Sequence, residues 1–206
     1  MRASPQWLLP AALQGTAPAS CRNLAKAGRF RNRPAFATIA PPFDDFAPQA
    51  AIVGVSSLAA QRCDGSPQRL SRVVDEPSWD GALSQALEGV NDGGLAYEIS
   101  KRLLIHWVPA AIAALAAKGV RVNTVSPGPV RTQMLKDFRV SMGAERIDAA
   151  QRLTGRHADA GEIAAPIAFL LGRDASWING IDLRADGGLQ ALRDWQARTA
   201  AKEGRS

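Results

Sequence analysis

The sequence predicts an α/β fold with a doubly wound parallel sheet and flanking helices. Three short apolar runs rich in β-branched residues, near residues 51–56, 119–125 and 180–185, have the pattern of buried strands. Helical patterns separate these runs, and strands that alternate with helices form parallel sheets. With 206 residues, of which 46% are hydrophobic, the chain is long enough for one domain with its own core.

The formal net charge of +6 comes from the amino-terminal segment. Residues 1–43 contain six basic residues and no acidic one, whereas the remainder has 19 of each. A neutral domain gives no reason to expect a nucleic-acid partner. The two cysteines, Cys21 and Cys63, have neither metal-ligand spacing nor a disulfide framework, which suits a cytoplasmic protein without a metal. No apolar run reaches the roughly 18 residues of a membrane span, so we expect no membrane partner.

Residues 1–49 form a basic, proline-containing segment that we expect to be poorly ordered. The prolines within residues 34–48 disfavour both helix and strand. Two alternatives stay open for this segment. Ala17-Pro18-Ala19 follows a short apolar stretch and is weakly similar to a signal-cleavage site, and an acid-free start also suits an organelle transit peptide.

The first predicted strand, near residues 51–56, ends in two serines, Ser56 and Ser57. Serines often end strands for structural reasons, which is one interpretation of this motif. A second interpretation is the nucleophile elbow G-x-S-x-G of hydrolases, because Gly54-Val55-Ser56 matches its first half, but Leu58 stands where the second glycine belongs. After the serines we predict a polar loop at 62–70, a short helix at 77–87 and a turn at 89–94.

Tyr97 is the only tyrosine of the chain, and Lys101 follows it four positions later. Four residues make about one helical turn, so both side chains lie on one face. An ammonium group beside a phenol lowers the phenol pKa from its usual value of about 10, which would make Tyr97 a general acid or base. The structural alternative is a half-buried tyrosine with a solvated lysine beside it.

The helix that carries this pair is predicted to continue through 101–117 and to stop at Gly119. Pro109 removes one backbone donor within it, so we expect a kink there. His106 is interpreted as a surface or packing residue rather than a base. Further along, Asp159 and Glu162 have the spacing of a capping box that opens a helix at 163–171.

The order of these motifs resembles the short-chain dehydrogenase/reductase family. The family's Y-x-x-x-K motif matches Tyr97–Lys101, its P-G-x-V-x-T motif matches Pro127–Thr132, and its serine motif matches the strand that ends at Ser57. The match continues through Ala175–Gly180 to the closing turn Asp186-Gly187-Gly188. This resemblance implies a Rossmann-like sheet and an NAD- or NADP-dependent oxidoreductase that interconverts an alcohol and a carbonyl compound.

The resemblance also implies roles for individual residues. Ser57 would hold the carbonyl oxygen, Tyr97 would give or take the proton, and Lys101 would bind the nicotinamide ribose while lowering the tyrosine pKa. Asn123 resembles a structural asparagine of the family. The residues expected to bind the cofactor are Tyr97, Lys101, Pro127, Gly128, Val130 and Thr132.

The 40 positions from Ser57 to Tyr97 resemble the branch of the bacterial 3α-hydroxysteroid dehydrogenase/carbonyl reductase, which has an insert here. We place this insert at about 61–93 and expect it to cover the catalytic helix. By analogy the substrate would be a hydroxysteroid or another bulky carbonyl compound, and a homo-oligomer would form through the last strand and the helix 163–171. The candidate apolar substrate contacts are Met134, Leu135, Phe138 and Met142.

One family motif is missing from the sequence. The family opens with T-G-x-x-x-G-x-G, whose glycines let backbone amides approach the cofactor phosphates, and Gly15-Thr16-Ala17-Pro18 does not match it. We therefore interpret residues 50–193 as the C-terminal part of such a domain and 194–206 as a polar tail that frays. The alternative to an enzyme is a truncated or frame-disrupted relative without catalysis, at most an interaction module.

Overall fold

The computed structural model describes residues 46–203, apart from positions 64, 92, 134, 137–138 and 140–142. Almost all of the segment expected to be poorly ordered therefore lies outside the described residues. The same holds for Met134, Phe138 and Met142 among the candidate substrate contacts.

Three parallel strands form the sheet, in the order β1 (Ala51–Val55), β2 (Arg121–Pro127) and β3 (Asp182–Ala185). Val55 of β1 pairs with Val125, and Val125 pairs in turn with Leu183 of β3. The predicted parallel α/β sheet is confirmed, with each strand within about two residues of its expected position. Among the described residues β1 pairs with β2 alone, so it forms an edge of the described sheet.

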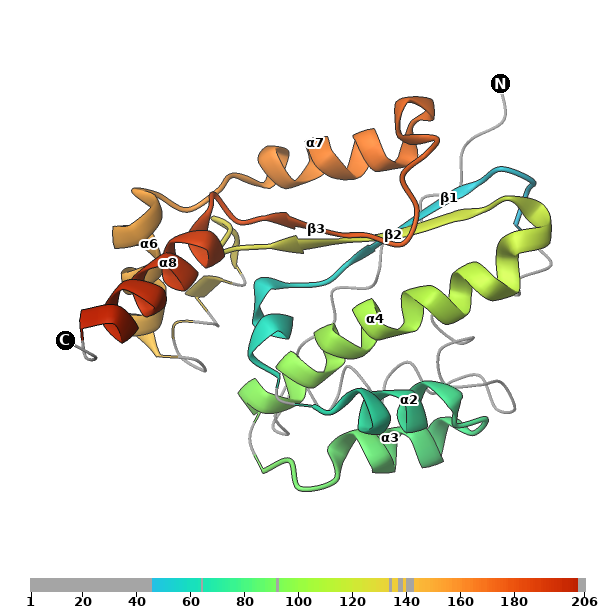
Figure 1. Ribbon diagram of the computed structural model, residues 1–206, viewed down its shortest axis with the longest axis horizontal. Helices are drawn as coiled ribbons and strands as arrows, with labels where there is room; N and C mark the ends of the chain where they lie inside the picture. Colours follow the sequence, from blue (N-terminus) through green and yellow to red (C-terminus); the bar gives the residue numbers. More distant parts are fainter. Residues whose placement is uncertain are drawn as a thin grey trace.

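Helices cover both faces of this sheet. Helix α4 lies against one face and α7 against the other, while α6 and α8 lie at the end where the strands reach their carboxyl termini (Figure 1). The helices are α2 (Pro67–Asp75), α3 (Trp79–Leu87), α4 (Gly93–Leu115), α6 (Ala144–Thr154), α7 (Ala160–Leu171) and α8 (Leu189–Glu203). Short 3-10 turns are η2 (Leu58–Arg62), η3 (Ala116–Lys118) and η4 (Arg173–Ala175).

The prediction of a polar loop at 62–70 is wrong for the second half of this segment, because α2 begins there. The Ser66 hydroxyl accepts a hydrogen bond from the Arg69 amide at 3.2 Å, and Pro67 occupies the first turn. A serine cap followed by proline starts a helix, and that signal was present in the sequence. The helix predicted at 77–87 is confirmed as α3.

The insert packs onto the outer side of α4, as expected. Leu70 and Val73 of α2 and Ala82 and Ala86 of α3 belong to one buried cluster with the apolar residues of α4. The opposite side of α4 approaches the sheet closely at Gly54, where a β-carbon would lie 3.2 Å from the Leu104 side chain. The α4 members of the cluster are Ile99, Leu103, Trp107, Val108, Ala111 and Leu115.

Helix α4 begins at Gly93, earlier than predicted, and continues unbroken through Pro109. Together with η3 it is 26 residues long and contains an 18-residue window with a mean hydropathy of 1.3, so by length and composition it could cross a membrane. The expectation that no apolar run is long enough to span a membrane is therefore corrected. One such helix is weak evidence for a membrane, because α4 lies between the sheet and α2–α3 as the core helix of an α/β domain does.

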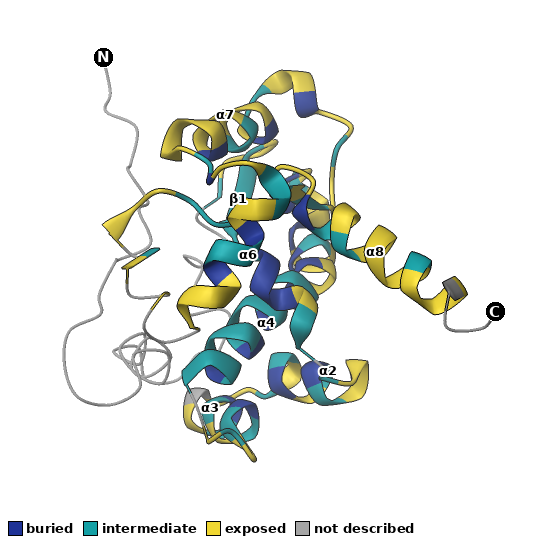
Figure 2. Cartoon of the chain, turned by 90° about the vertical axis from the view of Figure 1, so that its left-hand side faces the viewer, coloured by how far each residue is buried: buried dark blue, intermediate teal, exposed yellow. Residues whose placement is uncertain are grey.

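The last described helix, α8, is helical as far as Glu203, although we expected the chain to fray from residue 194. Most of its surface is exposed (Figure 2). It is held to the rest by Leu189, which is 1% exposed and clusters with Leu58 and Ala150.

Candidate active site

The site predicted from the sequence lies where β1 and β2 end. The Ser56 amide donates to the Val125 carbonyl at 2.8 Å, which continues the ladder one residue beyond β1. Because the strands are parallel, Ser57 and Pro127 lie at the same end of the sheet, where the strands reach their carboxyl ends. Ligands of open α/β sheets bind at this carboxyl edge.

Two hydrogen bonds fix α4 to the end of β1. The Ser56 hydroxyl donates to the Lys101 carbonyl at 2.8 Å, and the Lys101 ammonium donates to the Val55 carbonyl at 3.0 Å. In one bond a residue after β1 donates to α4, and in the other a residue of α4 donates to β1. Together they set the depth at which the helix turn Tyr97–Lys101 lies above the strand end.

Tyr97, Ser57 and Lys101 are brought together by this arrangement. Ser57 lies close enough to the Tyr97 hydroxyl to lower its pKa, and the Lys101 ammonium lies 5.6 Å from the centre of the Tyr97 ring. Ser57 also caps η2, because its hydroxyl accepts from the Ala59 amide at 3.2 Å. The structure therefore places all three catalytic candidates in one group.

The pKa of Tyr97 departs from the direction expected from its spacing to Lys101. Burial raises it above the usual value of about 10, and this outweighs the lowering by the Ser57 hydrogen bond and by the charge of Arg62. Burial also lowers the pKa of Lys101. Both shifts favour the uncharged forms, so the expectation of a lowered tyrosine pKa is wrong for this structure.

The predicted cofactor loop follows β2 at the same edge. The Gly128 amide donates to Ala185 at 3.1 Å, and a β-carbon at Gly128 would lie only 3.0 Å from the Asp186 α-carbon. Val130 forms an isolated bridge with Ala158, and Thr132 is exposed. Pro127, Gly128, Val130 and Thr132 thus lie on the segment that ends β2 and leads toward α6, and this segment contacts Ala185 at Gly128 and Ala158 at Val130.

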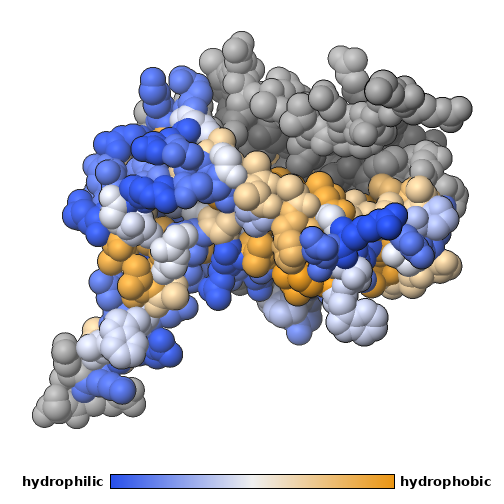
Figure 3. Space-filling view, turned by 90° about the horizontal axis from the view of Figure 1, so that it is seen from above, coloured by the Kyte–Doolittle hydropathy of each residue, from blue (hydrophilic) through white to orange (hydrophobic). Residues whose placement is uncertain are grey.

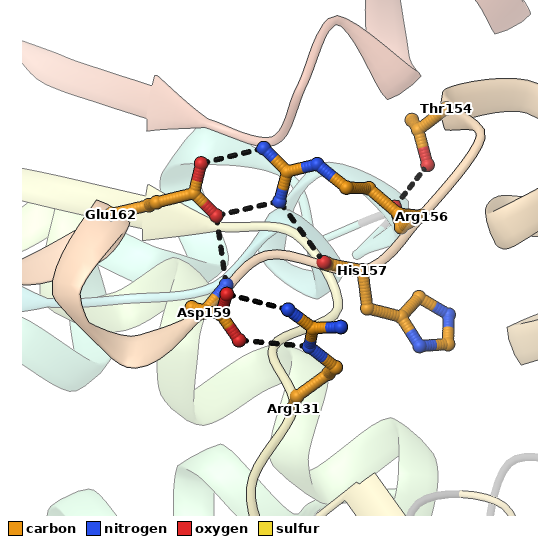
Figure 4. A network of polar contacts seen from close by, with 6 residues as sticks. All are labelled: Arg131, Thr154, Arg156, His157, Asp159 and Glu162. Atoms are coloured by element: carbon orange, nitrogen blue, oxygen red, sulfur yellow. Dashed lines mark hydrogen bonds and ion pairs between the residues drawn. The ribbon is translucent and has the colours of Figure 1, made fainter.

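Arg131 of this loop and Arg156 of the segment before α7 each pair with an acidic residue at the start of α7 (Figure 4). The Arg131 guanidinium binds the Asp159 carboxylate, and Arg156 binds both oxygens of Glu162 at 2.6 Å. The Asp159 amide donates to Glu162 at 2.9 Å, so the glutamate half of the predicted capping box is present. The hydrogen bonds from Arg156 and from the Asp159 amide lower the pKa of Glu162 to about 2. The capping-box spacing pointed to Asp159 and Glu162. No pattern in the sequence predicted that arginines would pair with them.

A third ion pair, which no sequence pattern predicted, includes the residue after Tyr97. Arg62 of η2 donates to Glu98 of α4 at 2.7 Å. The two residues are 36 positions apart, so only the folded chain brings them together.

Two further expectations concern polar residues outside this group. Asn123 is fully buried, donates to the Ile178 carbonyl and accepts from the Ile181 amide, as expected of a structural asparagine. His106 lies 2.9 Å from the Ser71 hydroxyl between α4 and α2, which supports the packing interpretation. Within the part of the chain that the structure describes, no three His, Cys, Asp or Glu side chains gather as metal ligands would.

A family model described as Enoyl-(Acyl carrier protein) reductase matches residues 82–190. Coniferyl-alcohol dehydrogenase of Pseudomonas sp. (strain HR199 / DSM 7063) is 40% identical over 94 residues, covering 45% of this chain and 37% of its own length. The 3-alpha-hydroxysteroid dehydrogenase/carbonyl reductase of Comamonas testosteroni is 33% identical over 147 residues, which are 70% of this chain and 57% of that protein. The chain thus spans 37% and 57% of the length of these two relatives.

The fold is similar to that of a solved enzyme. The crystal structure of the 3-alpha-hydroxysteroid dehydrogenase from Pseudomonas sp. B-0831, complexed with NADH, matches with a TM-score of 0.67 and 27% identity. The match covers 89% of this chain and 72% of the other.

Proposed function

We propose that this chain, which belongs to the short-chain dehydrogenase/reductase family, is an oxidoreductase that interconverts an alcohol and a carbonyl compound with NAD or NADP. The observation that carries the proposal is the grouping of Ser57, Tyr97 and Lys101 at the carboxyl ends of the strands, with the Lys101 ammonium 5.6 Å from the centre of the tyrosine ring. A phenol, a hydroxyl and an ammonium group in one place can hold an oxygen and exchange a proton with it.

The residues fit the nicotinamide end of such a cofactor. An ammonium group has three N–H donors, and among the described residues the hydrogen bond recorded for Lys101 goes to Val55. Further donors of this half-buried group suit the hydroxyls of a ribose. Pro127, Gly128, Val130 and Thr132 lie at the same edge and would contact the nicotinamide group. The relative whose fold matches was crystallised with NADH, which supports this assignment.

The bound cofactor would supply or accept a hydride, and the chain's own side chains would handle the oxygen and its proton. Ser57 binds the substrate oxygen, on which negative charge develops as a carbonyl is reduced. Tyr97 donates its proton to that oxygen and takes it back in alcohol oxidation. With an ordinary pKa of about 10 the phenol is protonated at neutral pH, and burial raises the pKa of Tyr97 further.

For the substrate, we propose a hydroxysteroid or another bulky carbonyl compound. The support is the likeness to two 3-alpha-hydroxysteroid dehydrogenases and the position of the insert over α4. Leu135, the one candidate substrate contact among the described residues, is half-buried and follows Thr132 by three positions.

The test is an assay of NADH and NADPH oxidation with a 3-ketosteroid, an aromatic aldehyde and a small cyclic ketone. Tyr97→Phe removes one hydroxyl, and turnover should fall by about 100-fold or more because general acid catalysis is lost. Ser71→Ala removes a hydroxyl outside the site, next to His106, and should leave turnover near that of the unchanged chain. Turnover that persists in Tyr97→Phe would remove Tyr97 from the mechanism.

An interaction module without catalysis is a second candidate, favoured by one observation. The sequence has no T-G-x-x-x-G-x-G turn, and that turn binds the cofactor phosphates in the family. The same assay distinguishes the two candidates, since an interaction module oxidises neither cofactor with any carbonyl compound.

We also propose a cytoplasmic location. For the organisation of the chain, we propose an amino-terminal segment 1–49, a domain part 50–193 and a tail 194–206. The structure extends helix α8 across the last boundary to Glu203. Limited proteolysis should cut first before residue 50. A first cut inside 50–193 would require other boundaries.

A further inference from the structure

The loop that follows β2 is held to the start of α7 by three contacts. The Arg131 amide donates to the Ala158 carbonyl at 2.8 Å, and the Ala158 amide donates to the Pro129 carbonyl at 3.1 Å. These two hydrogen bonds make up the isolated bridge between Val130 and Ala158. The third contact is the ion pair between Arg131 and Asp159, the residue that precedes α7. Three consecutive loop residues are thus held through the backbone and through one side chain.

The bridge fixes the directions of the amide and the carbonyl of Val130. In a trans peptide unit the C=O and the N–H point in opposite directions, and the described residues contain no cis peptide bond. The Pro129 carbonyl faces Ala158, so the Val130 amide in the same unit faces away. The Arg131 amide also faces Ala158, so the Val130 carbonyl faces away too. Neither group has a hydrogen-bond partner within the described part of the chain, so Val130 presents a free donor and a free acceptor on one side.

The Arg131 guanidinium binds the Asp159 carboxylate through two parallel hydrogen bonds. Nε donates to Oδ1 at 2.8 Å, and Nη2 donates to Oδ2. The two side chains are 56% and 58% exposed. An exposed ion pair contributes little by itself, but bidentate geometry and membership of a network are the exceptions. Both apply here, because Glu162 accepts from the Asp159 amide at 2.9 Å and also binds Arg156 (Figure 4). Asp159 is therefore held in place by α7 while its carboxylate holds the loop.

We propose that Arg131 is a positioning residue that, through Asp159, holds the free amide and carbonyl of Val130 in place for the carboxamide of the nicotinamide. The inference rests on the proposed function, in which NAD or NADP is the cofactor. A primary carboxamide has an acceptor oxygen and two N–H donors, so it complements a neighbouring donor and acceptor. The P-G-x-V-x-T pattern leaves the position of Arg131 open, so the motif gives it no role. Its guanidinium is bound to Asp159, so Arg131 acts through the backbone of the loop.

Arg131 would act on cofactor affinity rather than on proton transfer. A loop that is ordered before binding loses less conformational freedom when the cofactor arrives, so the affinity is higher. Without the ion pair, only the two backbone bonds and the apolar packing of Val130 hold the loop, and so short a bridge opens more often. Ser57, Tyr97 and Lys101 lie outside this loop, so their arrangement stays unchanged. A variant of Arg131 should therefore weaken cofactor binding with little change in kcat.

The first measurement needs no cofactor. Amide hydrogen exchange of the full chain, resolved by residue in NMR spectra, reports how often the bridge opens. Arg131→Gln should accelerate exchange at the amides of residue 131 and Ala158 by about 2- to 5-fold, the effect of losing a favourable ion pair. Asp159→Asn keeps a side chain that can cap α7 and should have the same effect. The Gly128 amide, which donates to Ala185, is the internal control and should exchange as before.

The second measurement is a fluorescence titration with NADH and NADPH, together with kcat and KM for a ketone. Arg131→Gln should raise the dissociation constant by the same factor of about 2 to 5, while kcat changes little. Arg131→Lys keeps the charge but loses the bidentate fork, so its affinity should lie between the two. Arg156→Gln is the matched control, because it removes an arginine of the same network that binds Glu162 rather than Asp159. It should leave exchange at residues 131 and 158 and the cofactor affinity unchanged.

Unchanged exchange at both amides in Arg131→Gln overturns the inference, and so does equal acceleration in Arg156→Gln. Faster exchange with unchanged cofactor affinity overturns it as well, because the loop is then not positioned for the cofactor. Failure of the proposed function looks different, since the unchanged chain then binds neither NADH nor NADPH. In that case the exchange rates still decide whether Arg131 holds Val130 in place. Where Arg131→Gln does not fold, Asp159→Asn takes its place.

Discussion

The Lys101 ammonium lies 3.0 Å from the Val55 carbonyl oxygen, so the lysine of the Y-x-x-x-K motif is bound to the last residue of β1. The bond joins a carbonyl at the end of β1 to a half-buried charged group, and this burial lowers the pKa of Lys101. Burying a cation costs free energy, which a single carbonyl offsets only in part. The cofactor-binding role proposed for Lys101 would account for a group that costs stability at this position.

Lys101→Met should therefore separate function from stability. A lysine whose pKa is lowered by folding destabilises the fold at every pH where it is charged in the unfolded chain, and the loss diminishes as the pH rises toward 10.5. We expect the methionine variant to melt at the same temperature as the unchanged chain or higher at pH 7, while nicotinamide cofactor binding and turnover fall. Lys202→Met, an exposed change on α8, should leave the melting temperature, cofactor binding and turnover unchanged. A melting temperature that drops together with binding would show that Lys101 is mainly structural.

The sheet could be predicted from the sequence because buried parallel strands are short β-branched runs, and all three lie near their expected positions. The start of α4 was missed because Gly93 and Gly94 suggested a turn. The pKa of Tyr97 was predicted in the wrong direction since residue spacing shows a neighbouring charge but not the burial that opposes it. The pairing of Arg62 with Glu98 depends on tertiary packing across 36 positions, and no local pattern contains it.

Acid should weaken the contact between the start of α7 and the segment that precedes it. The folded pKa of Glu162 is about 2 against 4.5 ordinarily, so its pairing stabilises the fold above pH 4.5 and is lost as the pH falls to about 2. Glu162→Gln should reduce the fall in urea midpoint between pH 4.5 and pH 2.5. Glu145→Gln removes an exposed acid from the first turn of α6 and is the control. Equal pH dependence in both variants would exclude a special role for the pair Arg156–Glu162.

The insert should contribute to stability as part of the core. Leu70 of α2 is 3% exposed within the cluster that includes Leu103 and Trp107 of α4. Leu70→Ala should lower the free energy of unfolding by about 2–5 kcal/mol, the range for leucine truncations in packed cores. Leu192→Ala, at a side chain 39% exposed on α8, should cost much less in the same urea titration. Similar costs would mean that α2 packs only loosely on α4.

The insert and the exposed apolar residues together predict how copies of the chain associate. Helices α2 and α3 cover the outer side of α4, so two α4 helices cannot meet there. On the other face, apolar side chains gather along α7 and the segment that leads to β3 (Figure 3). Four large ones are well exposed, namely Phe169 at 47%, Leu171 at 48%, Trp177 at 99% and Ile181 at 38%. Large exposed apolar groups in one region mark interaction surfaces.

We therefore expect a homo-oligomer formed through this region, and the double change Phe169→Ser with Trp177→Ser should lower its mass in sedimentation velocity. Trp195→Ser is the matched control, because Trp195 is 64% exposed on α8, away from α7, and its loss should leave the mass unchanged. The reason for the difference is that only the first pair removes apolar area between subunits. Chemical cross-links that join two α4 helices, or a monomer for the unchanged chain at all concentrations, would contradict this assembly.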